Sequence, residues 1–106
     1  MIEQPNKNYI QQLSAGDPEF EKKIVGIIQR EFPEEKKEFL NNFNNKQFLK
    51  TAENVHKLKH KIGMLGFEIG YQTAIDFEEG LKENNPSLFP KFIVILDSIE
   101  TFLDTL

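Results

Sequence analysis

Hydrophobic residues recur at spacings of three and four along most of the chain, which is the spacing of one face of an α-helix. The first such segment begins with Asp17 as the predicted N-cap and Pro18 at the first helical position. Its apolar positions are Phe20, Ile24, Ile27, Ile28, Phe39, Leu40 and Phe43. Pro33 interrupts this pattern and has no N–H to donate, so the segment is predicted to be either two helices or one long helix kinked at the proline.

A second helix is predicted from about residue 45 to residue 65, where Gly66 ends it. Its apolar stripe consists of Phe48, Thr51, Val55, Leu58, Ile62 and Leu65. A third is predicted from about residue 67 to residue 83, with Ile69, Ala74, Ile75, Phe77 and Leu81 on its core face. Because glycine is unfavourable inside a helix, we expect Gly70 to allow a close approach between helices.

The sequence Asn84, Asn85, Pro86 predicts a turn, with Ser87 as a candidate N-cap. The last predicted helix starts near Pro90 and buries Phe92, Ile95, Leu96, Ile99, Phe102 and Leu103. No segment shows the strict alternation of a β-strand. We therefore expect one all-α domain over residues 1–106, an antiparallel up-down four-helix bundle with an extra N-terminal helical segment.

Composition narrows the classes of function. The chain has 106 residues, of which 39% are hydrophobic, and no cysteine, which excludes disulfides, thiolate zinc sites and cysteine nucleophiles. A net charge of −4 argues against a general nucleic-acid binder. The start does not resemble a signal peptide and the longest apolar run, residues 92–96, is too short to span a bilayer, so we expect a cytoplasmic protein with no membrane partner. Nothing in the pattern suggests an obligate dimer, so we also expect a monomer.

Two histidines, His56 and His60, lie four positions apart and share one face of the second predicted helix. Helical geometry places His56 roughly 130° from the core direction, on the shoulder of the helix and open to solvent. Its expected neighbours are Leu49, Ala52, Glu53, Lys59, His60 and Gly63. The side chains expected to point further into water are Lys50, Asn54, Lys57 and Lys61. Residues 46–65 hold five lysines and one acid, so this segment is a local positive patch on an acidic protein.

Three interpretations compete for this pattern. Charged helix faces are most often only solvated surface. Two histidines at this spacing can share a metal ion, but the chain offers no third histidine or cysteine and the lysines would repel a cation, so we expect no metal. The third is phosphoryl transfer, because a neutral imidazole is a good nucleophile and Lys59, one turn away, can offset phosphoryl charge.

The run "VHKLKHKIGMLG", residues 55–66, resembles the hallmark of the histidine-containing phosphotransfer (HPt) domain, which reads roughly A-H-x-L-K-G with a further glycine near the helix end. His56 matches the phosphorylated histidine, Leu58 the core leucine, Lys59 the phosphate-facing lysine and Gly66 the later glycine. Three further features also resemble the family: the start of the upstream helix, the proline within that helix, and the polar link before the helix that carries the histidines. Val55 stands where the family usually has alanine, and His60 where it usually has glycine.

The resemblance implies a phosphorelay intermediate that takes a phosphoryl group from a receiver-domain aspartate onto His56 and passes it to another receiver. Lys59 would stabilise phosphoryl charge and His60 would be an auxiliary residue, while the partner receiver would supply Mg²⁺ and this domain would bind no cofactor. The chain has no ATP-binding motif, so it is expected to be a carrier and not an enzyme. The residues expected to contact a receiver are Leu49, Ala52, Glu53, Lys57, Gly63, Met64 and Phe67, although Phe67 could equally cap the core. The alternative is a bundle adaptor that binds a receiver or kinase without carrying phosphate.

Overall fold

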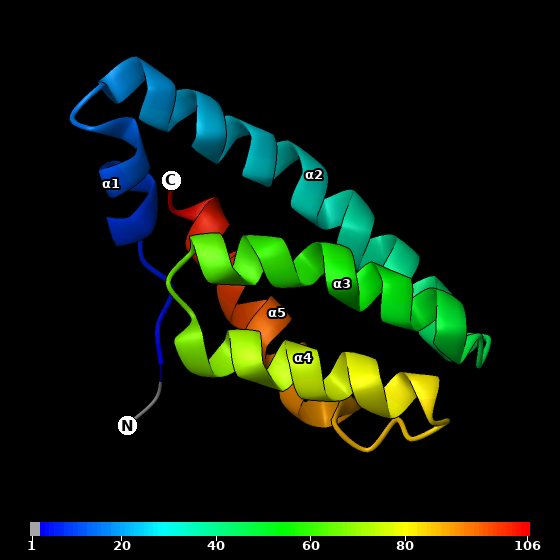
Figure 1. The fold of residues 1–106 in the computed structure, drawn as a ribbon. Helices are drawn as coiled ribbons and strands as arrows, with labels where there is room; N and C mark the ends of the chain where they lie inside the picture. The colour runs from blue at the N-terminus through cyan, green and yellow to red at the C-terminus, as the bar shows by residue number, and fades with distance from the viewer. Residues whose placement is uncertain (1–2) are drawn as a thin grey trace.

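The computed structural model describes residues 3–106, and within them the chain forms five α-helices and no strand (Figure 1). The helices are α1 (Asn8–Ser14), α2 (Pro18–Asn44), α3 (Phe48–Met64), α4 (Glu68–Lys82) and α5 (Phe89–Asp104). The predicted all-α helical bundle is confirmed. In Figure 1, α3 lies between α2 and α4, and α5 crosses behind them on its way to the C-terminus. The contacts of α3 are most extensive with α4 and then with α2.

Helix α2 begins as its sequence predicts. The Asp17 side chain accepts hydrogen bonds from the backbone N–H groups of Glu19 at 3.0 Å and Phe20 at 3.3 Å. The helix then continues through Pro33 to Asn44, so the segment is one long helix. Phe20 has the apolar spacing of this helix, yet its side chain is 45% exposed in the first turn, where α2 extends beyond α3 (Figure 1).

The core is built around phenylalanine rings from three helices. Phe39 of α2 packs edge-on against Phe77 of α4 and Phe92 of α5, with ring centroids 6.2 Å and 5.3 Å away. Phe43 and Phe89 stack on each other at 3.9 Å beside this group. The predicted stripe of α3 is buried from Thr51 to Leu65, with Phe48 partly buried against the core.

Two predictions for residues near the starts of helices are wrong. Ile69 was expected in the core but is 69% exposed, because it lies in the first turn of α4. Ser87 was the candidate N-cap of the last helix, yet α5 begins at Phe89 with Leu88 at the cap and no side-chain cap hydrogen bond. The Ser87 N–H instead donates to Asn85 Oδ1 at 3.1 Å, within the turn itself.

Gly70 has the close-packing role that the sequence predicted. A Cβ at this position would lie 3.1 Å from Phe67 and 3.3 Å from Ile62 of α3, which is tighter than ordinary contact. Gly66, with φ of +81°, makes the left-handed step between α3 and α4. Together these glycines let α4 fold back closely along α3.

The start of α4 is capped by a residue far away in the sequence. Phe67, at the N-cap position, offers no side-chain hydrogen bond. The carboxylate of Glu3 instead accepts from the N–H groups of Ile69 at 3.0 Å and Gly70 at 2.9 Å. The Asn6 N–H also donates to the Leu65 carbonyl at 2.8 Å, so the N-terminal segment is attached to the turn between α3 and α4.

We predict that Glu3→Ala lowers the free energy of unfolding by about 1 kcal/mol, the typical cost of losing a helix cap. Chemical denaturation of the variant and the wild type measures this difference. Glu38→Ala is the matched control, because Glu38 is exposed on α2 and has no recorded polar contact within residues 3–106. Equal losses in the two variants would contradict a capping role for Glu3.

Candidate functional site

His56 lies on α3 with its side chain 54% exposed, between the buried residues Val55 and Leu58. Its Nδ1 atom is 3.1 Å from Oε1 of Glu78 on α4, a residue 22 positions later in the chain. The predicted shoulder position of His56 is therefore correct. Glu78 was not predicted from the sequence, since nothing in the spacing along one helix shows which carboxylate a neighbouring helix will bring.

The contact with Glu78 decides which nitrogen of His56 can react. A carboxylate only accepts hydrogen bonds, so we assign the imidazole proton to Nδ1, which leaves the lone pair on Nε2. The Nζ atom of Lys59 lies 3.3 Å from the same Nδ1 and 3.6 Å from Glu78 Oε1. Because a protonated Nδ1 cannot accept from an ammonium group, Lys59 is paired with Glu78 and not with the ring.

Glu78 stands at the centre of this cluster, with its side chain only 13% exposed. Burial by itself would raise the pKa of the Glu78 carboxyl, but hydrogen bonds from Lys82 and His56 and the positive charge of Lys59 outweigh burial and hold the pKa below its usual value. The Lys82 Nζ atom donates to Glu78 Oε2 at 3.2 Å. Glu78 is thus an ionised acceptor that joins α3 to α4 at the candidate nucleophile.

His60 is exposed and lies against His56. The two imidazole rings are 5.1 Å apart between centroids and nearly perpendicular, at 87°. The structure therefore brings together three predicted residues, His56, Lys59 and His60. It adds Glu78 and Lys82 to them.

Two residues that were expected to point into water contact α2 instead. The Lys61 ammonium lies 3.1 Å from Glu31 Oε1 and also pairs with Glu35. Burial alone would lower the pKa of Lys61, but the hydrogen bonds and negative charges of Glu35 and Glu31 raise it above its usual value. Asn54 is 5% exposed and accepts a hydrogen bond from Asn42 at 2.7 Å. Their predicted orientation was wrong because helical periodicity does not show that α2 covers this side of α3.

An open groove of about 690 Å³ lies beside His56 between α3 and α4. Its lining residues are Leu49, Ala52, Glu53, His56, Lys57, Glu78 and Lys82. Leu49 is 70% exposed there, whereas Ala52 is 2% exposed. Four of the residues expected to contact a receiver, Leu49, Ala52, Glu53 and Lys57, therefore line one hollow next to the candidate nucleophile.

The other three residues expected to contact a partner are engaged within the bundle. Phe67 is 3% exposed in the core, so its alternative role as a core cap holds. Met64 is partly buried against the same core. A Cβ on Gly63 would lie 3.1 Å from the ring of Tyr71, so the space beside this glycine is filled by Tyr71 of α4.

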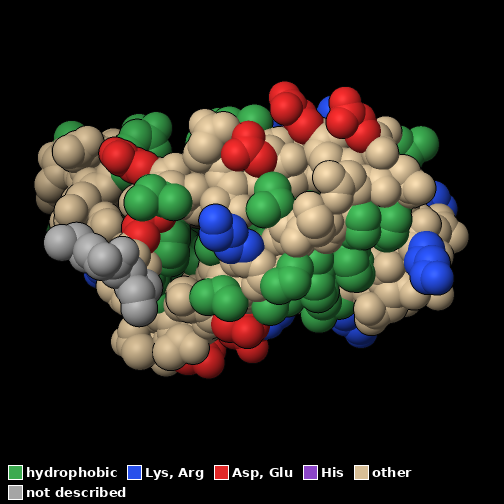
Figure 2. Space-filling model, turned by 90° about the horizontal axis from the view of Figure 1, so that it is seen from below, with side chains coloured by type: hydrophobic (Ala, Val, Ile, Leu, Met, Phe, Trp, Pro, Cys, Tyr) green, Lys and Arg blue, Asp and Glu red, His purple; other side chains and the backbone are tan. Residues whose placement is uncertain are grey.

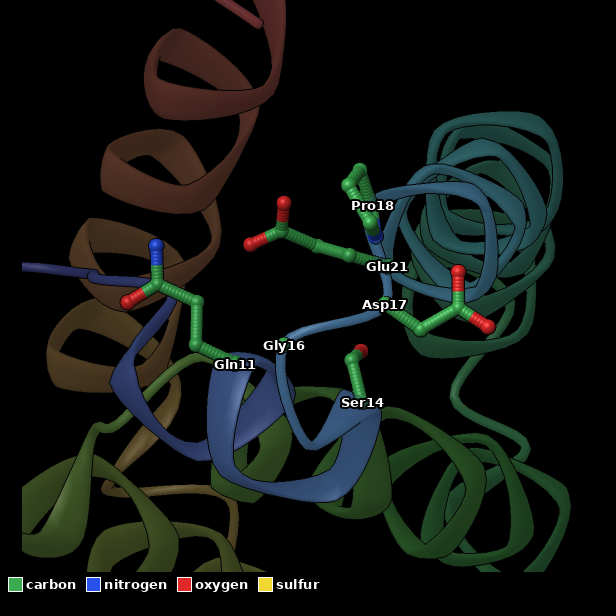
Figure 3. Close-up of a pocket in the computed structure, with 6 residues that line it drawn as sticks. All are labelled: Gln11, Ser14, Gly16, Asp17, Pro18 and Glu21. Atoms are coloured by element: carbon green, nitrogen blue, oxygen red, sulfur yellow. The ribbon is translucent and has the colours of Figure 1, made fainter.

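Other parts of the surface offer less chemistry. In the view from below, hydrophobic side chains group across the centre and right and no histidine is visible (Figure 2). Figure 3 shows a hollow at the turn between α1 and α2, where Glu21 points inward and Asp17 points away toward the helix that it caps.

Within residues 3–106 no three His, Cys, Asp or Glu side chains are grouped so that they could hold a metal ion. None of the helices in this range has the length and apolar character that a membrane span needs.

Comparison with known proteins finds no match to a protein-family model, to a curated protein or to a solved structure.

We predict that Glu78→Gln is less stable than the wild type by about 1–2 kcal/mol at pH 7, because it loses hydrogen bonds between charged groups. Since folding lowers the pKa of Glu78, the stabilisation is present above the pKa of an ordinary glutamate and is lost as the pH falls through the folded-state value. Denaturant unfolding across the acid range should show the two curves converging. If the difference in unfolding free energy between Glu78→Gln and the wild type stayed constant down to the lowest pH, the ionised Glu78 carboxylate would not be its source. Glu79→Gln, an exposed neighbour on the same helix, is the control.

Proposed function

We propose that this protein is a phosphorelay intermediate of two-component signalling, which carries a phosphoryl group on Nε2 of His56. The observation that carries the proposal is the contact between His56 Nδ1 and Glu78 Oε1 at 3.1 Å, beside an open groove. This hydrogen bond keeps the proton on Nδ1 of His56 and leaves Nε2 as an available nucleophile. The resemblance of residues 55–66 to the HPt hallmark supports the same role for His56.

The transfer step needs no proton movement within this protein. The Nε2 lone pair attacks the phosphorus of an aspartyl phosphate in a receiver, an N–P bond forms, and the O–P bond breaks with its electron pair returning to the aspartate carboxylate. Nδ1 keeps its proton, so the phosphorylated ring becomes cationic. The Glu78 carboxylate, ionised because its pKa is lowered, stabilises that cation.

Lys59 is suited to offset the charge of the phosphoryl oxygens. Its side chain is 13% exposed and its ammonium already lies within 3.3 Å of the His56 ring. A flexible lysine can turn from Glu78 toward a phosphoryl group once that group is bound. The receiver would supply Mg²⁺, because the carboxylate nearest to His56 is engaged by Lys59 and Lys82.

The groove beside His56 is the surface that we propose for receiver docking. Leu49 supplies exposed apolar area and Lys57 supplies positive charge, whereas the charge of Lys82 is paired with Glu78. A neighbouring hollow shares Leu49 and Lys82 and adds Lys46 and Lys50. These lysines would attract an acidic receiver face, in an interaction that salt screens.

Mixing the protein with phosphorylated receivers tests the proposal. We expect the wild type to acquire acid-labile, base-stable label and His56→Gln to acquire none. His60→Gln should still be labelled. Retention of the label by His56→Gln, or its loss only in His60→Gln, would contradict the assignment.

The rival function, an adaptor that binds a receiver without carrying phosphate, predicts a different outcome. An adaptor would bind receivers in a pull-down or by calorimetry, with equal affinity for the wild type and His56→Gln. It would show no transfer from any phosphorylated receiver.

We predict that Lys59→Met slows phosphoryl transfer from a receiver by roughly 100- to 1,000-fold, the range for loss of one group that stabilises developing charge. Rapid-quench kinetics at saturating receiver separate this effect from weaker docking. The control is Lys91→Met, which removes an exposed lysine from α5, away from the α3–α4 groove. Equal rates for the two variants would remove Lys59 from the mechanism.

A further inference from the structure

His60 has one specific contact within the described chain, the perpendicular packing of its ring against His56. Within residues 3–106 His60 makes no hydrogen bond, although it lines a hollow that contains charged groups of α2 and α3. These groups are Arg30, Glu31, Glu34, Glu35, Lys57 and Lys61. Lys61, Glu31 and Glu35 are engaged with one another.

One hydrogen bond at Nδ1 does not hold an exposed imidazole in one orientation. The ring of His56 can still swing about its contact with Glu78, because more than half of its side chain is open to solvent. A second contact on the ring removes this freedom. His60 provides it from the next turn of the same helix, at a centroid distance of 5.1 Å and an angle of 87°.

We infer that His60 is a positioning residue that holds the His56 ring through edge-to-face packing, so that Nε2 stays directed at an incoming phosphoryl group. This inference deepens the proposed phosphocarrier function and rests on it. The role needs an aromatic ring at position 60 but no hydrogen-bond donor. Its benefit is a larger fraction of molecules with His56 in the reactive orientation before the phosphodonor arrives.

Two variants separate packing from hydrogen bonding. His60→Phe keeps an aromatic ring and removes the ring nitrogens, whereas His60→Gln keeps a donor and removes the ring. The probe is phosphoramidate, a small phosphodonor that reacts with histidine without a receiver. The measurement is the second-order rate constant for phosphorylation of His56, with His56→Gln as the blank.

We expect His60→Phe to react within about twofold of the wild type and His60→Gln to be roughly threefold to tenfold slower, the range that the energy of one aromatic pair allows. Because Glu78 keeps the proton on Nδ1 in every variant, the second readout is the mobility of the His56 ring, measured by NMR relaxation of its ring C–H groups. The ring should be rigid in the wild type and in His60→Phe and mobile in His60→Gln, while backbone relaxation stays the same in all three proteins.

The opposite order, with His60→Gln fast and His60→Phe slow, would assign His60 a hydrogen-bonding role and overturn the inference. Equal rates for all three proteins would also overturn it, and so would a wild type whose His56 does not react at all. If phosphoramidate labels His56 with the expected order but no receiver transfers to it, the proposed relay function fails while the positioning role of His60 stands.

Discussion

The packing of α3 against α4 is the constraint on which the site depends. His56 and Glu78 are 22 residues apart, and only this packing brings Nδ1 and Oε1 to 3.1 Å. The rotation of α3 is set by its buried stripe, because Val55 and Leu58 must face the core and thereby turn His56 to the shoulder of the helix. Gly70 allows the two helices to approach closely, because a Cβ there would lie 3.3 Å from Ile62 of α3, tighter than ordinary contact.

Contacts from outside the pair hold α3 and α4 in this arrangement. Glu3 caps α4 and the Asn6 backbone binds the turn after α3, so the N-terminal segment secures one end of the hairpin. On the side of α2, Asn42 bonds to Asn54, and Glu31 and Glu35 pair with Lys61. One strip of α3 is left open, and it carries both histidines.

Electrostatics divides the lysines of the positive patch into two groups. Lys59 and Lys61 are largely buried and paired with carboxylates of neighbouring helices, so their charges are compensated within the bundle. Lys46, Lys50 and Lys57 are exposed and form no recorded ion pair within residues 3–106. A count of lysines along the sequence therefore overstates the charge that a partner would meet, and the exposed group lies toward the α3–α4 groove.

Several features follow from local rules and could be predicted from the sequence. Capping by Asp17 and Pro18 started α2 where expected, helical periodicity identified the buried face of α3, and the shoulder position of His56 followed from that face. The prediction for Ile69 was wrong, and Phe20 is exposed despite its apolar spacing, because helical periodicity does not show where the bundle stops covering a helix. Phe32 is fully buried although it directly precedes Pro33, because the helix continues through the proline that interrupts the sequence pattern.

The helices, their apolar faces and the exposure of a histidine with a lysine one turn away can be predicted from the sequence, because they depend on interactions within a few residues. The packing of the helices settles which carboxylate holds His56, which lysines form ion pairs and that Phe67 belongs to the core. Those outcomes depend on side chains that α2 and α4 bring to α3. The distance between helices, and not the order of residues along one helix, sets which charges meet.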